Sequence, residues 1–442
     1  MSDLAPTHAI APASAPPATG GHSGTARLLV KLAWRSLWRN KRRTQITLSS
    51  IGFGLSLAIF FGSLAEGTYE KAEHDATELL SGQLTVETPT YNDNPGPTLS
   101  LEGAPALREE LARLPGVLRA RSLVTAQGVA STGAGALGVA LLGVDPALEV
   151  GHSPLQNKLV EGKMISADEP RGILVGRGLA ERLRVQPGKK VVLTSTDVQG
   201  NVSSELFRVS GIFRLGSDEL DTYLVQAQLP LVQKMLGLRA DQVGQIGLFL
   251  APGEDVPAQV RAEVQALLDR AHQGSLRVRS WEETVPALAA WMKVDRSSNN
   301  VTRMLIVFLV MFTILNTLLM SVLERGHEFA VLLALGTPRR QLQAQVLLEV
   351  AMMAVLGCTL GFALGLAAAF WGQHWGIDLT RFIPEGATAG GMALDPIIHC
   401  KVSFPAFVKL TLFVFATTLL LGVWPMRRAG QIELAASLRT QR

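Results

Sequence analysis

Four long apolar runs stand out in the pattern of hydrophobic and polar positions along this chain. They cover residues 44–65, 301–323, 346–371 and 406–424. A helix crosses the roughly 30 Å hydrocarbon core of a bilayer in about 20 residues, and each run is long enough to do so. A signal-peptide core is the alternative for the first run, but no small-residue cleavage site follows it. The pattern therefore predicts four transmembrane helices.

Basic residues near the ends of these runs set the expected orientation. They precede the first run, follow the second and follow the fourth: Lys31, Arg35, Arg39, Lys41, Arg42, Arg43, Arg325, Arg339, Arg340, Arg427, Arg428, Arg439 and Arg442. Cytoplasmic flanks of membrane proteins carry the excess of Lys and Arg. With four spans, all three basic flanks lie on one side. We therefore expect both termini and the loop at 324–341 to be cytoplasmic, with residues 67–300 outside.

Between the first and second runs, short β-type segments alternate with helical patterns. Residues 82–87, 138–145, 190–195 and 206–213 are examples, each bounded by Gly, Pro, Asp or Asn. The predicted fold class is thus an α-helical membrane protein with four transmembrane helices, one plus three. A large extracytoplasmic α+β domain at 67–300 lies between the first and second of them.

The remaining segments complete the predicted domains. Residues 1–24 are rich in Ala, Pro, Ser, Thr and Gly, which predicts a disordered tail. Residues 25–66 comprise an entry helix and the first span, and residues 301–442 form a three-helix transmembrane domain. From about residue 287 to 323 the pattern is helical without interruption. One helix about 55 Å long should therefore join the α+β domain to the membrane.

The predicted entry helix is amphipathic, with tryptophans at the boundary between its faces. Its basic stripe comprises Lys31, Arg35, Arg39 and Arg42, its apolar side Leu29, Val30, Ala33 and Leu37, and its boundary Trp34 and Trp38. Such a helix suits a lipid headgroup surface. The alternative is an ordinary basic flank without a separate helix.

Composition agrees with a membrane protein and excludes several functions. Charged residues make up 18% of the chain, below the roughly 25% of soluble domains, and mean hydropathy is +0.25. The net charge of +4 does not indicate a nucleic-acid binder. Cys358 and Cys400 are too few for a disulfide framework or a four-cysteine zinc site.

Sequence motifs for catalysis are missing too. The chain has no phosphate-binding loop of the Walker type, and His327-Glu328 lacks the second histidine of a zinc protease because Val331 stands there. Arg303, Lys409 and Glu349 lie near span ends, where they can reach an interface, so an ion-coupled carrier is disfavoured. We expect no catalytic residue, cofactor or metal.

The loop at 324–341 is the most informative segment. Residues 329–335 are almost wholly apolar yet too short to span a membrane. An apolar helix exposed to the cytosol normally needs a partner to cover it. The alternative is a helix packed back on the membrane surface.

A second feature is a glycine stripe in the third run. Gly357, Gly361 and Gly365 are four residues apart, a spacing that lets helices approach closely. The stripe can contact the second or fourth span, or a second copy of the chain.

Several motifs resemble those of the MacB-like (FtsX-type) permeases of ABC transporters. The loop signature comprises residues 316–325 (NTLLMSVLER), Glu328 and Ala334-Leu-Gly336, although Gly326 and Leu333 replace residues that are often polar or basic in the family. Residues 32–43 resemble the family's entry helix, and residues 425–429 with Leu438-Arg439 resemble its C-terminal tail. Residues 142–146 (LGVDP) and 173–180 (ILVGRGLA) are similar to the lipoprotein-releasing, LolC/LolE-like branch.

This resemblance implies site residues and partners. The segment 324–341 would be a coupling helix that docks on a separate cytoplasmic ABC ATPase, through Glu324, Arg325, Glu328, Phe329, Gly336 and Arg339. A second permease copy or paralogue would complete a dimer. The further expected contacts are membrane lipid and a periplasmic lipoprotein carrier or adaptor. Lipid or substrate contact is assigned to Phe60, Phe61, Leu64 and Phe308.

The implied function is transport driven by a separate ATPase, with the long second helix carrying motion to the periplasmic domain of an inner-membrane protein. The first expectation is extraction of lipoproteins from the outer leaflet of the inner membrane. Efflux of amphipathic drugs or peptides, and activation of a periplasmic hydrolase without transport, are the alternatives. An independent receptor or scaffold would leave the apolar loop helix unexplained. The sequence does not specify the substrate, the choice between homodimer and heterodimer, or the role of the tail.

Overall fold

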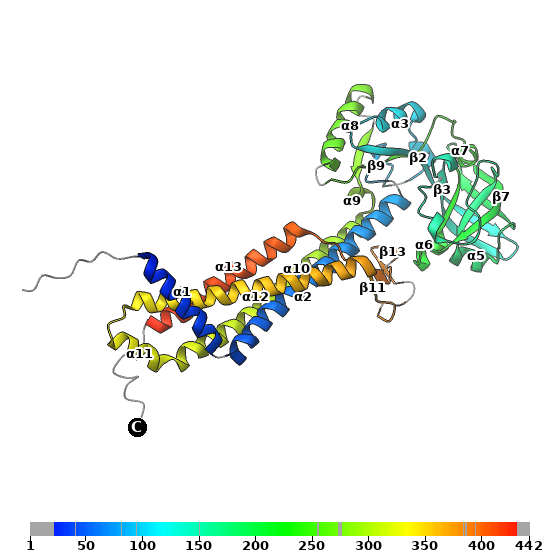
Figure 1. The fold of residues 1–442 in the computed structure, drawn as a ribbon. Helices are drawn as coiled ribbons and strands as arrows, with labels where there is room; N and C mark the ends of the chain where they lie inside the picture. The colour runs from blue at the N-terminus through cyan, green and yellow to red at the C-terminus, as the bar shows by residue number, and fades with distance from the viewer. Residues whose placement is uncertain are drawn as a thin grey trace, which may run out of the picture. The chain divides into compact units, whose positions relative to one another are not determined.

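The structure is a computed structural model that describes residues 22–39, 41–80, 82–93, 95–149, 151–253, 256–272, 276–382, 384, 387–393 and 395–430. The chain forms two compact units (Figure 1). We call residues 1–60, 303–368 and 403–442 the helical unit, and residues 61–302 and 369–402 the α+β unit. The predicted tail 1–24, except its last three residues, and the C-terminal Leu438, Arg439 and Arg442 lie outside the described residues.

Four helices of the described chain are long and apolar enough to cross a membrane, as predicted. They are α2 (Lys41–Leu79), α10 (Pro286–Glu324), α12 (Arg339–Trp375) and α13 (Phe404–Gly430). The first three have 37 to 39 residues, so each is about 55 Å long and exceeds the hydrocarbon core. Helix α10 is the uninterrupted helix that the sequence predicts, and it begins at Pro286 because proline suits the first turn of a helix.

The entry segment is a separate helix, α1 (His22–Arg39), which begins inside the predicted tail. Ala33 and Leu37 are fully buried, whereas Trp34 and Trp38 are exposed. The helix therefore packs through one narrow apolar face, and its tryptophans point away from that packing.

The glycine stripe of α12 packs on α2 inside the same chain. A Cβ atom added at Gly357 or Gly365 would lie 2.7 Å from Ile51 Cβ or 2.9 Å from Ile59 Cβ. At Gly361 it would lie 2.8 Å from the carbonyl oxygen of Gly52. Because the absent side chains let the two backbones meet, the stripe contacts the first span. The expected contacts with the second span, the fourth span or a second copy are corrected.

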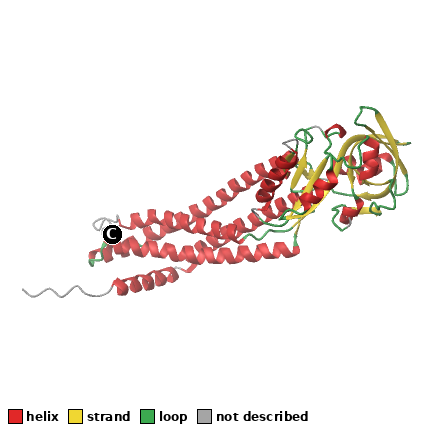
Figure 2. Ribbon diagram, turned by 90° about the horizontal axis from the view of Figure 1, so that it is seen from above, coloured by secondary structure: helices red, strands yellow, loops and turns green. Residues whose placement is uncertain are grey.

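The α+β unit contains every strand of the described chain (Figure 2). Its main sheet has the order β10-β1-β9-β2-β3-β8-β5-β7-β4, with β6 pairing with both β2 and β7. The strands are β1 (Leu84–Glu87), β2 (Val117–Thr132), β3 (Gly135–Val144), β4 (Leu159–Gly162), β5 (Gly172–Gly176), β6 (Lys190–Thr196), β7 (Val202–Phe213), β8 (Leu224–Gln228), β9 (Gln245–Leu250) and β10 (Arg277–Ser280).

Strand β2 belongs to two parts of this sheet. Its first half pairs with β9, and its second half pairs with β3 and β6. The pairings β2–β3–β8–β5–β7–β6 return to β2, so these strands close into a barrel. Closure leaves fewer strand edges open to aggregation. The alternating pattern predicts the strands but not the closed barrel.

Short helices cover the sheet. They are α3 (Ala104–Ala112), α4 (Pro146–Glu149), α5 (Arg177–Leu183), α6 (Asp218–Tyr223), α7 (Leu229–Leu236), α8 (Val256–His272) and α9 (Trp281–Thr284), with 3₁₀ turns η1 (Pro97–Leu99) and η2 (Gln156–Lys158). The leucines of α3 and the valines of α8 that form apolar stripes in the sequence are buried in the core, including Leu107, Leu111, Val260 and Val264.

The segment between α12 and α13 forms two small two-stranded sheets. Strand β11 (Ile377–Asp378) pairs with β14 (Ile397–Ile398), and β12 (Thr388–Ala389) pairs with β13 (Met392–Ala393). We call residues 376–402 the strap. The strap belongs to the α+β unit, although spanning helices flank it on both sides.

Candidate coupling site

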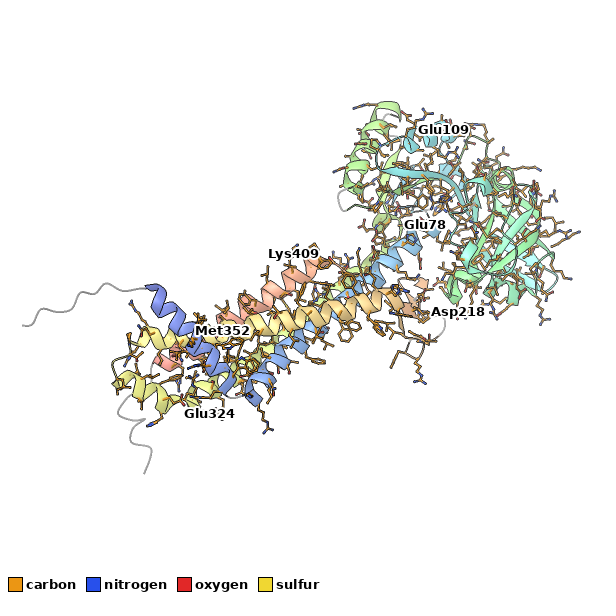
Figure 3. The ribbon with its side chains drawn as sticks, viewed as in Figure 1. Glu78, Glu109, Asp218, Glu324, Met352 and Lys409 are labelled. Atoms are coloured by element: carbon orange, nitrogen blue, oxygen red, sulfur yellow. The ribbon has the colours of Figure 1, made fainter. Side chains whose placement is uncertain are left out.

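Helix α11 (Gly326–Ala334) occupies the centre of the predicted coupling segment, directly after Glu324 at the end of α10 (Figure 3). The N–H of Gly336 donates to the carbonyl of Leu333 at 3.1 Å. Gly336 has a φ of 91°, a conformation that favours glycine. This glycine therefore ends α11, and α12 begins three residues later at Arg339.

The apolar run of α11 divides into two faces. Phe329 and Ala330 are fully buried, and Phe329 belongs to a small core with Val322, Leu342, Val346 and Ala429. Val331 is 40% exposed and Leu335 is 78% exposed. In this structure the Phe329 side chain packs α11 against its own bundle, and contact of Phe329 with a partner stays a prediction. We call Val331, Ala334 and Leu335 the docking face.

The other predicted docking residues surround this face. Glu324, Gly336 and Arg339 are exposed, and Glu328 is 46% exposed in its side chain. Arg325 is mostly buried, at 15%. Its guanidinium lies 5.0 Å from the Phe329 ring centre, within cation–π range. Direct partner contact stays a prediction for the exposed residues.

A chain of charged contacts joins α11 to α1 and α12. Arg325 Nη1 donates to Glu349 Oε2 at 2.9 Å, and Ser36 Oγ donates to the same oxygen at 3.1 Å. Arg39 Nη2 lies 2.8 Å from Glu328 Oε1, while Arg325 Nε lies 3.4 Å from Glu328 Oε2. The hydrogen bond from Arg39 holds the pKa of Glu328 below its usual range.

Sequence reasoning missed this chain of contacts. It placed Glu349 near an interface within reach of water, but the carboxylate pairs with Arg325 and is only 13% exposed. Arg39 and Glu328 are 289 positions apart. The available signal was an acidic residue close to the end of an apolar run, opposite several basic residues. The same contacts line a polar cavity of about 230 Å³ with the hydroxyls of Thr44 and Ser321.

We expect a charge reversal at Arg39 to weaken the contact between α1 and α11. Arg39→Glu places two carboxylates together, and adding Glu328→Arg restores an opposite pair. Because the pair is exposed, the coupling energy should be only about 0.5 kcal/mol and should weaken with salt. A double-mutant cycle on thermal unfolding in detergent measures it. Since the folded pKa of Glu328 is lowered, the stabilisation is present above about pH 4.3 and disappears as pH falls through the folded pKa. Additive single-variant effects would contradict this pairing.

The predicted lipid or substrate contacts lie on α2 and α10. Phe61 is 51% exposed and Phe308 is 59% exposed, whereas Phe60 and Leu64 are half-buried. Phe60 and Phe308 belong to the helical unit, and Phe61 and Leu64 to the α+β unit. Their assignment stays a prediction. Among the described residues, no group of three or more His, Cys, Asp or Glu is placed to hold a metal ion.

In the α+β unit, α2 and α10 are joined by polar contacts. Tyr69 Oη donates to Asp295 Oδ2 at 2.5 Å, and Asn299 Nδ2 donates to Tyr69 Oη at 2.6 Å. Arg296 adds an ion pair to Glu66 at 3.6 Å. These contacts hold the two helices together at this level.

A buried arginine fastens the end of α2 to the sheet. Arg121 of β2 donates from Nη2 to the carbonyl of Leu80 at 2.9 Å and from Nη1 to Glu149 Oε1 at 3.1 Å. Arg121 and Glu149 are 2% and 4% exposed. A cation at a helix C-terminus also interacts favourably with the negative end of the helix dipole. Arg121 thus connects the C-terminal end of α2 directly to β2.

Comparisons with known proteins match both units. A model of the MacB-like periplasmic core domain covers residues 44–267, and one of the FtsX-like permease C-terminal module covers residues 301–434. The lipoprotein-releasing system transmembrane protein LolC of Xylella fastidiosa is 23% identical, over 67% of this chain and 72% of its own length. The pyoverdine export ATP-binding/permease protein PvdT of Pseudomonas syringae is also 23% identical, over 96% of this chain and 61% of its own.

A solved structure also matches. The periplasmic region of MacB from Actinobacillus actinomycetemcomitans gives a TM-score of 0.34 at 11% identity, over 48% of this chain and 95% of that one.

Proposed function

Because this chain belongs to the permease family that carries a MacB-like periplasmic core domain and an FtsX-like C-terminal module, we propose that a separate cytoplasmic ABC ATPase drives it. The observation that carries this proposal is the docking face of α11. Leu335, which directly follows this short helix between two spans, is 78% exposed, and a partner is needed to cover it. The basic Arg339 beside it supplies a charged contact.

ATP-driven movement of α11 would reach the rest of the molecule by two routes. Helix α10 immediately precedes α11 in the chain, and it extends unbroken from Pro286 to Glu324. The contacts of Arg325 and Glu328 carry the same displacement to α12 and α1. In the α+β unit, Arg121 and the Tyr69–Asp295 pair then couple the helices to each other and to the sheet.

Lipoprotein extraction from the outer leaflet of the inner membrane is the substrate class that we propose first. The match to LolC and the LGVDP and ILVGRGLA segments support it. Export of an amphipathic molecule is second, because the match to PvdT covers 96% of the chain. A second permease copy or paralogue would complete the transporter. The glycine stripe does not supply that dimer contact, since α2 already occupies it.

Copurification tests the ATPase assignment. The full chain extracted in mild detergent should bring down a protein with nucleotide-binding motifs and ATPase activity, and Leu335→Asp should remove it. Val202→Asp is the matched control, since Val202 is 77% exposed on β7 of the α+β unit. Loss of the ATPase in both variants, or in neither, would contradict docking through α11.

Reconstitution then separates the substrates. In proteoliposomes with the ATPase, ATP should release a labelled triacylated lipoprotein from the bilayer. Release of amphipathic small molecules without lipoprotein release would favour the export alternative.

A further inference from the structure

The C-terminal end of the strap contacts α2. The N–H of Lys401 donates to the carbonyl of Ser63 at 2.9 Å, and Lys401 Nζ lies 3.0 Å from Glu70 Oε1. A second ion pair joins Lys71 of α2 to Asp395 of the strap at 3.3 Å. Two separate points of the strap are thus fastened to one helix.

Glycines bring the strap backbone against both long helices. A Cβ atom added at Gly67 of α2 would lie only 1.8 Å from the carbonyl oxygen of His399. At Gly390, between β12 and β13, it would lie 2.6 Å from Leu288 Cα of α10. Gly390 also has a φ of 58°, which favours glycine. The strap therefore contacts α2 and α10 at backbone distance.

Three large aromatic side chains near these contacts are exposed. Trp371, Trp375 and Phe382 are 58%, 72% and 82% exposed. Trp371 and Trp375 lie one turn apart at the end of α12, and Phe382 follows in the strap next to the exposed Arg381. A soluble surface rarely leaves three such side chains uncovered within twelve positions of the chain.

The position of the strap between two spanning helices indicates that lipid covers these aromatic side chains. The strap begins where the spanning helix α12 ends and finishes where the spanning helix α13 begins. Both of its ends therefore connect directly to helices long and apolar enough to cross a membrane, and Trp371 and Trp375 themselves lie among the last residues of α12. Tryptophan rings prefer the headgroup level, where one side of the ring is apolar and the other is wet. Arg381 suits the phosphate groups there.

We propose that Trp371, Trp375 and Phe382 are seated in the phospholipid headgroup region of the leaflet on the side of the α+β unit, so that the strap holds α2 and α10 at that membrane surface. The two helices then tilt about a level fixed by lipid rather than slide through the bilayer. The lipid contact needs only the four spans. Its consequence for transport rests on the proposed function.

Fluorescence quenching in nanodiscs tests the lipid contact. An environment-sensitive fluorophore is attached to the full chain at Phe382→Cys, in bilayers of phosphatidylethanolamine and phosphatidylglycerol. Native Cys358 and Cys400 are buried, and the chain without the added cysteine is the labelling blank. Lipids that carry a nitroxide at the headgroup should lower the emission about twofold. The matched control Val202→Cys, exposed on β7, should not respond.

Two outcomes would overturn the proposal. Equal quenching at positions 382 and 202 would show that the strap does not meet lipid. Cross-linking of two chains through the cysteine at 382, with no quenching, would assign the face to a second copy.

A variant of the exposed aromatic residues tests whether the lipid contact of the strap is needed for substrate release. Combined Trp371→Ser, Trp375→Ser and Phe382→Ser should leave copurification of the ATPase unchanged and lower release about tenfold. Trp375→Tyr with Phe382→Tyr should keep release near the starting level, because tyrosine also suits the interface. Unchanged release in the serine variant would contradict the strap's role. Quenching retained alongside a failed ATPase pull-down would refute the proposed function alone.

Discussion

Substitution of Gly361 by leucine should destabilise the helical unit more than any other single change in the spans. The new Cβ would lie 2.8 Å from a backbone oxygen of α2 and 2.9 Å from Leu55 Cβ. Backbone cannot rotate away, so α2 and α12 must separate along the whole stripe. Overpacking of this kind costs about 3 kcal/mol. Thermal unfolding of the purified chain in detergent measures the loss.

The matched control is Gly326→Leu in α11, where nothing lies within 4 Å of an added Cβ. It should not lower the unfolding temperature, because the side chain has open space and leucine favours a helix more than glycine does. Size-exclusion chromatography with light scattering adds a second reading. If Gly361→Leu kept its stability but converted a dimer into a monomer, the stripe would be a contact between copies instead.

Substitution of Arg121 by methionine should be the most damaging change in the α+β unit. It leaves Glu149 charged, 4% exposed and without its partner, and it removes the donor to the carbonyl of Leu80. Breaking one side of a buried pair costs about 3–5 kcal/mol. Hydrogen exchange of the full chain should show faster exchange in β2 and at the end of α2.

Two further variants isolate the cause. Arg121→Met with Glu149→Leu should recover much of the loss, since no unpaired charge then remains. Arg113→Met removes an exposed arginine that lies 3.8 Å from Glu109, and it should cost less than about 1 kcal/mol. A double variant as unstable as Arg121→Met alone would mean that the contact with Leu80, not the charge pair, dominates.

The two variants also separate the proposed transmission path from simple stability. Arg121 lies where α2 meets the sheet, so partial loss of this contact should reduce substrate release while ATPase docking at α11 persists. Gly361 lies within the span bundle, and its loss should reduce both. This difference follows from where each contact sits along α2.

Local patterns account for the elements that the sequence predicts well. The four spans follow from run length, because about 20 apolar residues are stable only in hydrocarbon. The unbroken α10 follows from the lack of any helix breaker after Pro286. The strands β1, β3, β6 and β7 follow from short β-rich segments between turn residues. Each of these signals is contained in a few neighbouring residues.

The errors concern partners rather than elements. A seven-residue apolar run in α11 shows no polar side, so its composition could not reveal that Phe329 faces inward and Leu335 outward. The spacing of Gly357, Gly361 and Gly365 predicts a close helix contact but does not name α2 as the neighbour. Glu349 can pair with Arg325 only once α10 and α12 lie side by side.

By itself, the sequence determined the four spans, the long helix and the strand-rich region between the first and second spans, because hydrophobic length and periodicity act within single elements. Only the tertiary structure decided which helix fills the glycine stripe, which face of α11 stays open, where Arg121 is buried and how the strap meets α2. Those features depend on groups up to 338 positions apart in the sequence, as Lys401 and Ser63 are. Packing and charge pairing at such separations arise only when the whole chain has folded.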